Sequence, residues 1–241
     1  MKAMVLAAGL GTRLRPLTND RPKALVEVAG RTLLELALMR LRSFGIRDVI
    51  INVHHFADMV VDYLTTHHNF GMQIAISRED LLLDTGGGLK KAAWFFLEGN
   101  VGEPFLLHNV DVLSTIDLAR MVAFHLEQQA LATLAVQDRS TSRYLLFDSN
   151  GHLCGRRTGR DGALELVRPA HHVDAFAFSG IHVISPHLLP MLNEDGAFSI
   201  ITSYLRLAGA GESIYAFRAD EYSWRDMGTP ENIARATEEL K

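Results

Sequence analysis

The chain has 241 residues, of which 48% are hydrophobic and 22% charged, so it can bury the core of one large α/β domain or of a domain with a small attached lobe. Its 24 Lys and Arg residues against 28 Asp and Glu residues give a net charge of −4, which argues against a nucleic-acid or membrane-surface binder. The single cysteine excludes an intramolecular disulfide, and the apolar first residues lack the layout of a signal peptide, so we expect a cytoplasmic protein.

The first part of the chain alternates short apolar runs with helical patterns. Residues 2–8 predict a strand buried on both faces, and residues 9–23, rich in Gly, Pro and Arg, indicate a loop. Residues 32–44 have helical spacing, with Thr32 as a possible N-cap and Gly45 as a stop. Further strands are predicted at 49–53, 73–77, 105–108 and 131–136, and further helices at 56–64, 89–97 and 118–128. This alternation predicts parallel βαβ units and a sheet covered on both sides.

The pattern changes after about residue 140. Residues 143–153 resemble a hairpin with a tight turn at Asn150-Gly151. A strand at 176–184, a helix at 200–207, a strand at 214–217 and a closing helix at 229–240 follow. We therefore predict one domain over 1–241, an α/β three-layer Rossmann-like fold with a mixed sheet and a small β-rich lobe.

The loop at residues 9–23 places glycines and basic side chains directly after the first predicted strand. Gly9 and Gly11 allow positive φ and leave room for a ligand beside the backbone, whose successive N–H groups form an anion-binding concavity. In an open α/β sheet, ligands bind at the carboxyl ends of the strands, where this loop sits. Arg13, Arg15 and Lys23 supply cations at the same place. The loop therefore predicts a phosphate site.

Two known glycine motifs do not describe this loop. A dinucleotide-binding fingerprint needs a third glycine near position 14, where the chain has Leu14 and then Pro16. A Walker-type P-loop needs Gly-Lys-Ser or Gly-Lys-Thr after four residues, and the chain lacks it. A glycine-rich surface turn with solvated arginines is the structural alternative to phosphate binding.

The string Gly-Leu-Gly-Thr-Arg-Leu-Arg-Pro-Leu-Thr at 9–18, followed by Pro22-Lys23, resembles the signature of the nucleotide-sugar pyrophosphorylases, or sugar-phosphate nucleotidyltransferases. The resemblance runs from residue 2 to about residue 235. It implies a nucleotide-binding part over about 1–140, a sugar-binding part over about 141–228 and a closing helix over 229–241. It implies that Arg13 and Lys23 act in catalysis, Lys23 by neutralising charge around the α-phosphate. It also implies that the triphosphate is held by the backbone of Ala8, Gly9, Leu10, Gly11 and Thr12.

Two aspartates from distant parts of the chain are candidate metal ligands. Asp111 follows a predicted strand, and Asp226 lies in the string Trp-Arg-Asp-Met-Gly-Thr-Pro at 224–230. Nucleotidyl transfer depends on positioned phosphates and on cations, usually Mg²⁺ held by one or two carboxylates and substrate oxygens. Each aspartate alone could instead cap a loop or a helix. The resemblance implies that both hold Mg²⁺, with Val110 standing where many relatives have glycine.

Glycines before the predicted helix at 89–97 are candidates for base recognition. Glycines let a flat ring lie against the backbone, although Thr85 could equally cap a flexible helix entry. The resemblance implies nucleotide contacts at Asp84, Gly86, Gly87 and Asn109, with the glycine run lining the base pocket, and it favours the short members that uridylylate N-acetylmuramic acid 1-phosphate. It implies sugar contacts at Ser179, Gly180, Glu165 and Arg168.

These features predict an enzyme that forms an NDP-sugar and diphosphate from an NTP and a sugar 1-phosphate, with Mg²⁺ as cofactor. UTP with N-acetylmuramic acid 1-phosphate, or a similar hexose 1-phosphate, is the favoured pair. Mannose 1-phosphate with GTP is the alternative pair, and phosphocholine with CTP a more distant one. An inactive nucleotide-sugar-binding regulatory subunit is disfavoured because Arg13, Lys23 and both aspartates are present. We expect a monomer or small homo-oligomer without nucleic-acid or membrane partners.

Overall fold

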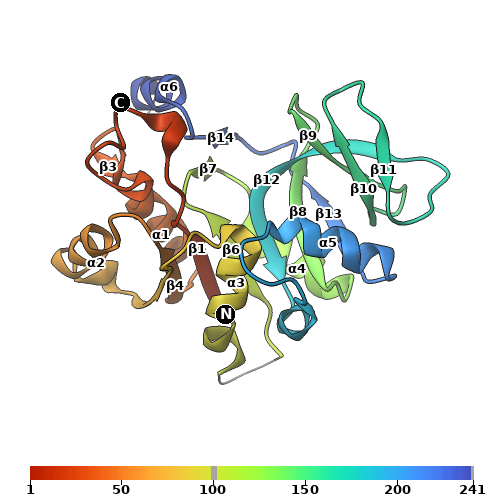
Figure 1. Ribbon diagram of the computed structural model, residues 1–241, viewed down its shortest axis with the longest axis horizontal. Coiled ribbons are helices and arrows are strands. Elements are labelled where there is room, and N and C mark those ends of the chain that lie inside the picture. Colours follow the sequence, from red (N-terminus) through yellow and green to blue (C-terminus); the bar gives the residue numbers. More distant parts are fainter. Residues whose placement is uncertain (99–101, 240–241) are drawn as a thin grey trace.

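A ten-stranded mixed sheet runs through the molecule and carries helices on both faces (Figure 1). The computed structural model describes residues 1–98 and 102–239. The strands lie in the order β11-β10-β9-β12-β6-β1-β4-β5, with β8 beside β12 and β13 beside β8. They are β1 (Lys2–Leu6), β4 (Asp48–Val53), β5 (Gln73–Arg78), β6 (Phe105–Asn109), β8 (Ala132–Gln137), β9 (Arg143–Phe147), β10 (Leu153–Thr158), β11 (Leu164–Leu166), β12 (Asp174–Ile184) and β13 (Ile214–Arg218).

Parallel pairing dominates the first part of the sheet, where β6, β1, β4 and β5 run in the same direction. Strand β12 is antiparallel to β6, β8 and β9, so the sheet becomes mixed beyond this point. Short pairs β2 (Glu27–Val28) with β3 (Arg31–Thr32) and β7 (Val112–Ser114) with β14 (Trp224–Asp226) lie outside the main sheet. The helices are α1 (Leu33–Ser43), α2 (Ala57–Thr66), α3 (Asp84–Leu97), α4 (Leu118–Glu127), α5 (Ile200–Gly209) and α6 (Pro230–Glu239).

Two hydrophobic clusters cover the two faces of the sheet. Successive side chains of a strand point to opposite faces, so Val5 of β1 joins the cluster with α1 and α4, while Met4 joins the cluster with α3 and α5. Both side chains are fully buried, which confirms the prediction that the first strand is covered on both sides. Helix α1 begins as predicted, because the Thr32 hydroxyl accepts a hydrogen bond of 3.0 Å from the N–H of Glu35.

The sequence misplaced some boundaries and missed the shortest strands. Helix α3 begins at Asp84, five residues before the predicted start at Leu89, so the glycine run lies inside the helix. The predicted hairpin is confirmed as β9 and β10. The closing helix begins at Pro230, and residues 240–241 of its predicted span lie outside the described residues. Within the described part of the chain, no helix is both long enough and apolar enough to cross a membrane.

Glycine at position 86 is required by close packing against the segment before α5. A Cβ at Gly86 would clash with the Phe198 ring and lie 2.9 Å from the Phe198 carbonyl oxygen. We expect Gly86→Ala to lower the free energy of unfolding by about 1–3 kcal/mol, the usual cost of overpacking, measured by urea denaturation. Gly102→Ala is the control, because Gly102 is exposed and has nothing within 4 Å of its Cβ position. Equal stability of the two variants would contradict this packing role.

Buried histidines make the stability of the fold depend on pH. Burial lowers the pKa of His182 to about 3 and that of His125 to about 4, from an ordinary 6.5. In the unfolded chain these histidines bind protons below about pH 6.5, whereas in the folded chain they bind them only below about pH 4. The free energy of unfolding therefore falls as the pH drops from about 6.5 to about 4. Each histidine contributes up to about 1.4 kcal/mol per pH unit. Urea midpoints between pH 7.5 and 4.5 should show this slope, and His125→Gln should flatten it. An unchanged slope in that variant would contradict the assignment.

Candidate active site

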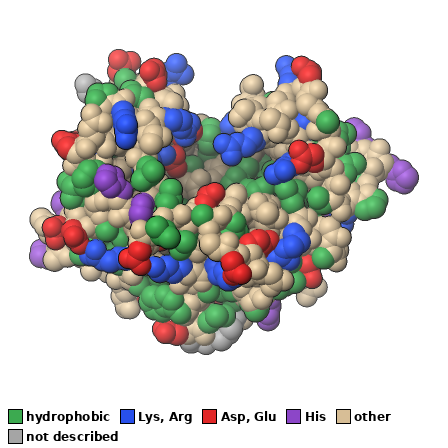
Figure 2. Space-filling view, viewed as in Figure 1, with side chains coloured by type: hydrophobic (Ala, Val, Ile, Leu, Met, Phe, Trp, Pro, Cys, Tyr) green, Lys and Arg blue, Asp and Glu red, His purple; other side chains and the backbone are tan. Residues whose placement is uncertain are grey.

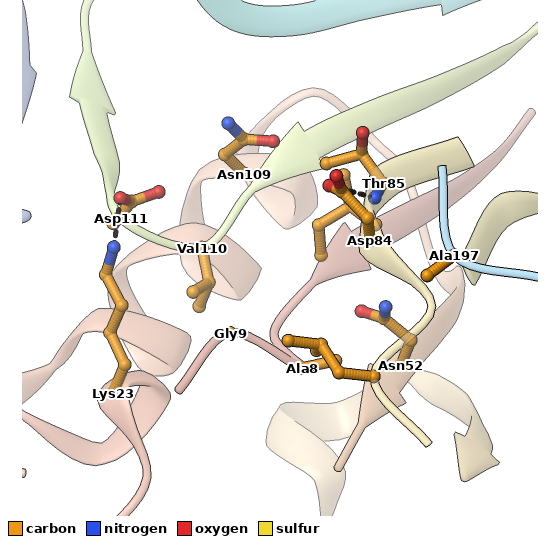
Figure 3. A pocket seen from close by; sticks show the side chains of 12 residues that line it. Ala8, Gly9, Lys23, Asn52, Asp84, Thr85, Asn109, Val110, Asp111 and Ala197 are labelled. Carbon is orange, nitrogen blue, oxygen red and sulfur yellow. Dashed lines mark hydrogen bonds and ion pairs between the residues drawn. The ribbon is translucent and has the colours of Figure 1, made fainter. Parts of the chain in front are cut away.

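A cavity of about 430 Å³ opens where β1, β4 and β6 end, below the deep hollow between the two raised parts of the surface in Figure 2. In Figure 3, Lys23 and Asp111 lie at one end of this cavity, and Asp84 and Thr85 lie at the other. Such a position, at the carboxyl ends of parallel strands, is the usual ligand site of an open α/β sheet. The lining residues are Leu6, Ala8, Gly9, Lys23, Asn52, Leu82, Asp84, Thr85, Asn109, Val110, Asp111 and Ala197.

The loop after β1 folds back so that Gly9 and Lys23 both line this cavity. Gly11 has a φ of 63°, and its carbonyl oxygen accepts hydrogen bonds of 2.8 Å from the Leu14 N–H and the Thr18 hydroxyl. This tight turn favours glycine, because a Cβ there would lie 2.9 Å from the Thr18 methyl group. Of the predicted backbone contacts, Ala8 and Gly9 line the cavity, while Leu10 is 44% exposed. Thr12 begins a short 3-10 helix that presents the next basic side chain.

Two cations of this loop face the two predicted metal ligands. The ammonium group of Lys23 forms an ion pair with Asp111, and both side chains are mostly buried. The guanidinium group of Arg13 is 3.8 Å from the carboxylate of Asp226 and is largely exposed. The structure therefore brings together the four charged residues that the sequence analysis selected from three separate segments.

The two aspartates meet because β7 and β14 pair with each other. Val112, directly after Asp111, is opposite Asp226 in this pair, and the Met227 N–H donates a 2.8 Å hydrogen bond to the Asp111 carbonyl oxygen. Burial and the neighbouring Asp111 carboxylate raise the pKa of Asp226, against the opposing effects of Lys23 and Arg13. A pair of close carboxylates is the donor set that Mg²⁺ uses when substrate phosphates and water complete its shell, so these residues fit that ion.

A buried polar network fixes the other end of the cavity. The Asn52 side chain accepts from the Ala7 N–H and donates to the Glu79 carboxylate, both at 2.7 Å. Glu79 also accepts a 2.9 Å hydrogen bond from the Leu83 N–H at the start of α3. These contacts tie the ends of β1, β4 and β5 to one helix terminus. Asn52 was not predicted from the sequence, although a lone amide in an apolar strand is a usable signal.

The structure shows a packing role for the glycine run. The N–H groups of Gly86 and Gly87 both donate to the Phe198 carbonyl oxygen, so they are not free to read a base edge. Thr85 also does not cap the helix, because its hydroxyl accepts a 3.0 Å hydrogen bond from the Ile200 N–H. Asp84 and Asn109 do line the cavity. The glycines instead allow α3 to approach the segment before α5.

The predicted sugar contacts divide into two groups. Ser179 is buried in β12, and Gly180 packs directly against the Asn109 side chain. Glu165 instead lies on β11, the outermost strand, where it pairs with Arg156 at 2.7 Å. Arg168 donates to the carbonyl oxygens of Gly211 and Glu212. The structure thus does not place Glu165 and Arg168 in the cavity, because Glu165 is on the outermost strand and Arg168 lies in the segment that follows it.

Arg139, a cationic side chain that was not predicted from the sequence, lies between β14 and β12. The guanidinium group of Arg139 is 3.5 Å from the centre of the Trp224 ring and donates a 2.7 Å hydrogen bond to the Phe178 carbonyl oxygen. Trp224 in turn donates a 2.7 Å hydrogen bond to the Ser179 carbonyl oxygen. This stack connects β14, the strand that carries Asp226, to the part of β12 next to Gly180.

The chain is similar in sequence to known enzymes. Residues 2–241 match the nucleotidyl transferase family. The N-acetylmuramate alpha-1-phosphate uridylyltransferase of Caulobacter vibrioides is 35% identical over 238 residues, which cover 95% of this chain and 92% of the relative. The mannose-1-phosphate guanylyltransferase 1 of Arabidopsis thaliana is 29% identical, with 95% of this chain and 62% of the relative covered. The chain therefore spans about three-fifths of the length of such longer relatives.

Solved structures share the same fold at lower sequence identity. HddC from Yersinia pseudotuberculosis superposes with a TM-score of 0.79 at 23% identity, and the match covers 100% of this chain and 99% of that one. A UDP-glucose pyrophosphorylase complexed with UDP-glucose gives a TM-score of 0.78 at 19% identity, covering 99% and 97%. These similarities confirm the Rossmann-like α/β fold predicted from the sequence.

Proposed function

Because the chain belongs to the nucleotidyl transferase family, we propose that it joins an NTP to a sugar 1-phosphate and releases diphosphate. The observation that carries this proposal is the convergence of four charged groups. Lys23 pairs with Asp111 in the lining of the cavity, and Arg13 pairs with Asp226, whose carboxylate neighbours that of Asp111. Phosphates need cations, and a metal ion needs carboxylates, and this site supplies both. The Caulobacter relative, which matches nearly end to end, supports the same class of reaction.

In the proposed reaction, a phosphate oxygen of the sugar 1-phosphate attacks the α-phosphorus of the NTP, and the bond to the diphosphate breaks. We propose that Lys23 binds the α-phosphate and that the exposed Arg13 binds the outer phosphates; the support is that both cations lie beside the two aspartates. Asp111 and Asp226 would hold Mg²⁺, which neutralises phosphate charge when bound. No side chain has to form a covalent bond, because positioning and charge neutralisation carry this chemistry.

We propose UTP and N-acetylmuramic acid 1-phosphate as the substrate pair. The support is the name and the coverage of the Caulobacter relative, which is 35% identical over 95% of this chain. GTP with mannose 1-phosphate is the alternative, supported by guanylyltransferase relatives at 27–29% identity. With either pair, the product would be a precursor of the cell wall or of another polysaccharide.

We also propose that the protein acts in the cytoplasm as a monomer or small homo-oligomer. Its nucleotide-binding part would span about 1–140 and be followed by a sugar-binding part.

A substrate panel tests this function directly. Purified protein with Mg²⁺ is mixed with each of UTP, GTP, CTP, ATP and dTTP, crossed with several sugar 1-phosphates, and diphosphate release is measured. We expect turnover with UTP and N-acetylmuramic acid 1-phosphate above the other pairs. Turnover only with GTP and mannose 1-phosphate would favour the alternative, and no turnover with any pair would refute the enzyme.

A further inference from the structure

A second cavity, of about 320 Å³, lies on the sugar side of the cleft between β9, β10 and the start of α5. Three arginines line it, Arg143, Arg156 and Arg157, and none of the described residues that line it is acidic. The remaining lining includes the hydroxyl groups of Thr and Ser residues and an apolar surface that contains Phe178. Figure 2 shows basic side chains on the corresponding wall of the cleft.

Two of these arginines carry charge that the described part of the protein does not neutralise. Arg156 donates to the Glu165 carboxylate at 2.7 Å, so its charge is paired. Arg143 and Arg157 form no ion pair with any described residue. The Arg157 guanidinium lies 5.1 Å from the centre of the Tyr144 ring, and its Nε is buried without a hydrogen-bond partner. An unpaired donor of this kind costs free energy unless a ligand accepts from it.

The arginine cavity adjoins the proposed reaction centre through two short segments. Phe178 lines it, and two residues later Gly180 packs against Asn109, which lines the first cavity. Ser199 lines it, and the next residue, Ile200, donates its N–H to Thr85 of the first cavity. Consecutive Cα atoms are about 3.8 Å apart, so β12 and the start of α5 bring the linings of the two cavities close to each other. A sugar whose phosphate is at the aspartates can therefore extend a substituent into the arginine cavity.

We propose that the arginine cavity binds a carboxylate carried by the sugar, and that it makes the enzyme prefer acidic sugar 1-phosphates. The inference rests on the proposed function and names the residues that set its sugar specificity. Guanidinium groups bind carboxylates through paired hydrogen bonds, and a cavity of this size has room for a carboxylate on a short apolar arm. The apolar lining at Phe178 suits that arm better than the three charged oxygens of a second phosphate.

The test compares two substrates that differ only in the acidic arm. N-acetylmuramic acid 1-phosphate is N-acetylglucosamine 1-phosphate with a lactyl ether, so the ratio of their kcat/KM values with UTP isolates the carboxylate. We expect the wild-type protein to prefer the acidic sugar by about tenfold or more. Arg143→Gln and Arg157→Gln should each lower that ratio by about tenfold, chiefly through KM for the acidic sugar. Arg78→Gln, which removes a surface arginine paired with Asp58, should leave the ratio unchanged.

The outcomes separate this inference from the function on which it rests. Turnover of both sugars with equal kcat/KM would overturn the arginine cavity as a carboxylate site while the transferase function stands. Equal losses for both sugars in the Arg143 and Arg157 variants would overturn it in the same way. No turnover of any sugar 1-phosphate would overturn both proposals. Thermal unfolding of each variant, expected within about 2 °C of wild type for partly exposed side chains, verifies that the fold is intact.

Discussion

Replacing Asp226 by asparagine is expected to lower kcat on the order of 10³-fold. Asparagine keeps the shape of the side chain and removes the charge, so the site loses one of the two carboxylates that the β7–β14 pair brings together. Diphosphate release at saturating UTP and sugar 1-phosphate, measured over a range of Mg²⁺ concentrations, gives kcat and the apparent metal affinity. Both should fall, because the variant retains only Asp111 as an anionic ligand.

The same substitution should not weaken the fold. Asp226 lies beside another carboxylate and is partly buried, and both conditions disfavour its ionised form. Removing its charge relieves this repulsion, so the urea midpoint of the metal-free variant at neutral pH should equal or exceed that of the wild type. Asp58→Asn is the control, since it removes a carboxylate from a surface ion pair with Arg78. Wild-type kcat in Asp226→Asn would remove the metal site from the mechanism and leave the fold untouched.

The sequence predicted the part of the site that depends on local chain chemistry. The buried apolar strand and the Gly9, Gly11 and Arg13 that follow it predict a loop at the carboxyl ends of the strands. This prediction is possible because strand burial and turn formation depend on nearby residues. Asp111 was found for the same reason, since it lies three residues after the end of the predicted strand 105–108. The structure adds the pairing of β7 with β14, which joins residues 112–114 to residues 224–226. Three-residue strands are too short to show an alternating pattern.

The positions of the other predicted site residues depend on long-range packing. The glycine run suggests exposed backbone when only the local sequence is considered, but Phe198, more than a hundred residues later, fills the space beside Gly86. The family resemblance assigned Glu165 and Arg168 to the sugar site, whereas their contacts in the structure are made with other segments. Glu165 contacts β10, and Arg168 contacts residues 211–212. Pairing with β10 directs Glu165 to Arg156. No local pattern in the sequence specifies that register.

Positive and negative side chains alternate across the site, and for this reason the loss of one of them should lower activity. Lys23 pairs with Asp111 and Arg13 pairs with Asp226, so each carboxylate has one cation beside it. Phosphates and a metal ion would compete for these four groups, the phosphates for the cations and the metal for the carboxylates. The ion pairs therefore hold the site in a form that substrates can enter by exchanging partners, without leaving a buried charge uncompensated.

Lys23→Gln is expected to lower kcat/KM for UTP by about 10²-fold. Lys23 lines the cavity with only 13% of its side chain exposed, so its charge acts at short range on any phosphate bound there. If it acts on the α-phosphate as the negative charge moves, kcat should fall more than the affinity for UTP. Steady-state kinetics separates these two effects, and a binding titration with UTP in the absence of the sugar measures the affinity independently.

Arg15→Gln is the matched control for Lys23→Gln. Arg15 is a cation of the same loop, but it is exposed, forms no ion pair with the described residues and is not among the residues that line the cavity. Its loss should change kcat/KM by less than about threefold, through weak long-range attraction of the nucleotide alone. Equal effects of the two substitutions would mean that the loop acts only through its net charge. A hundredfold difference, with kcat carrying most of it, would assign the transition-state contact to Lys23.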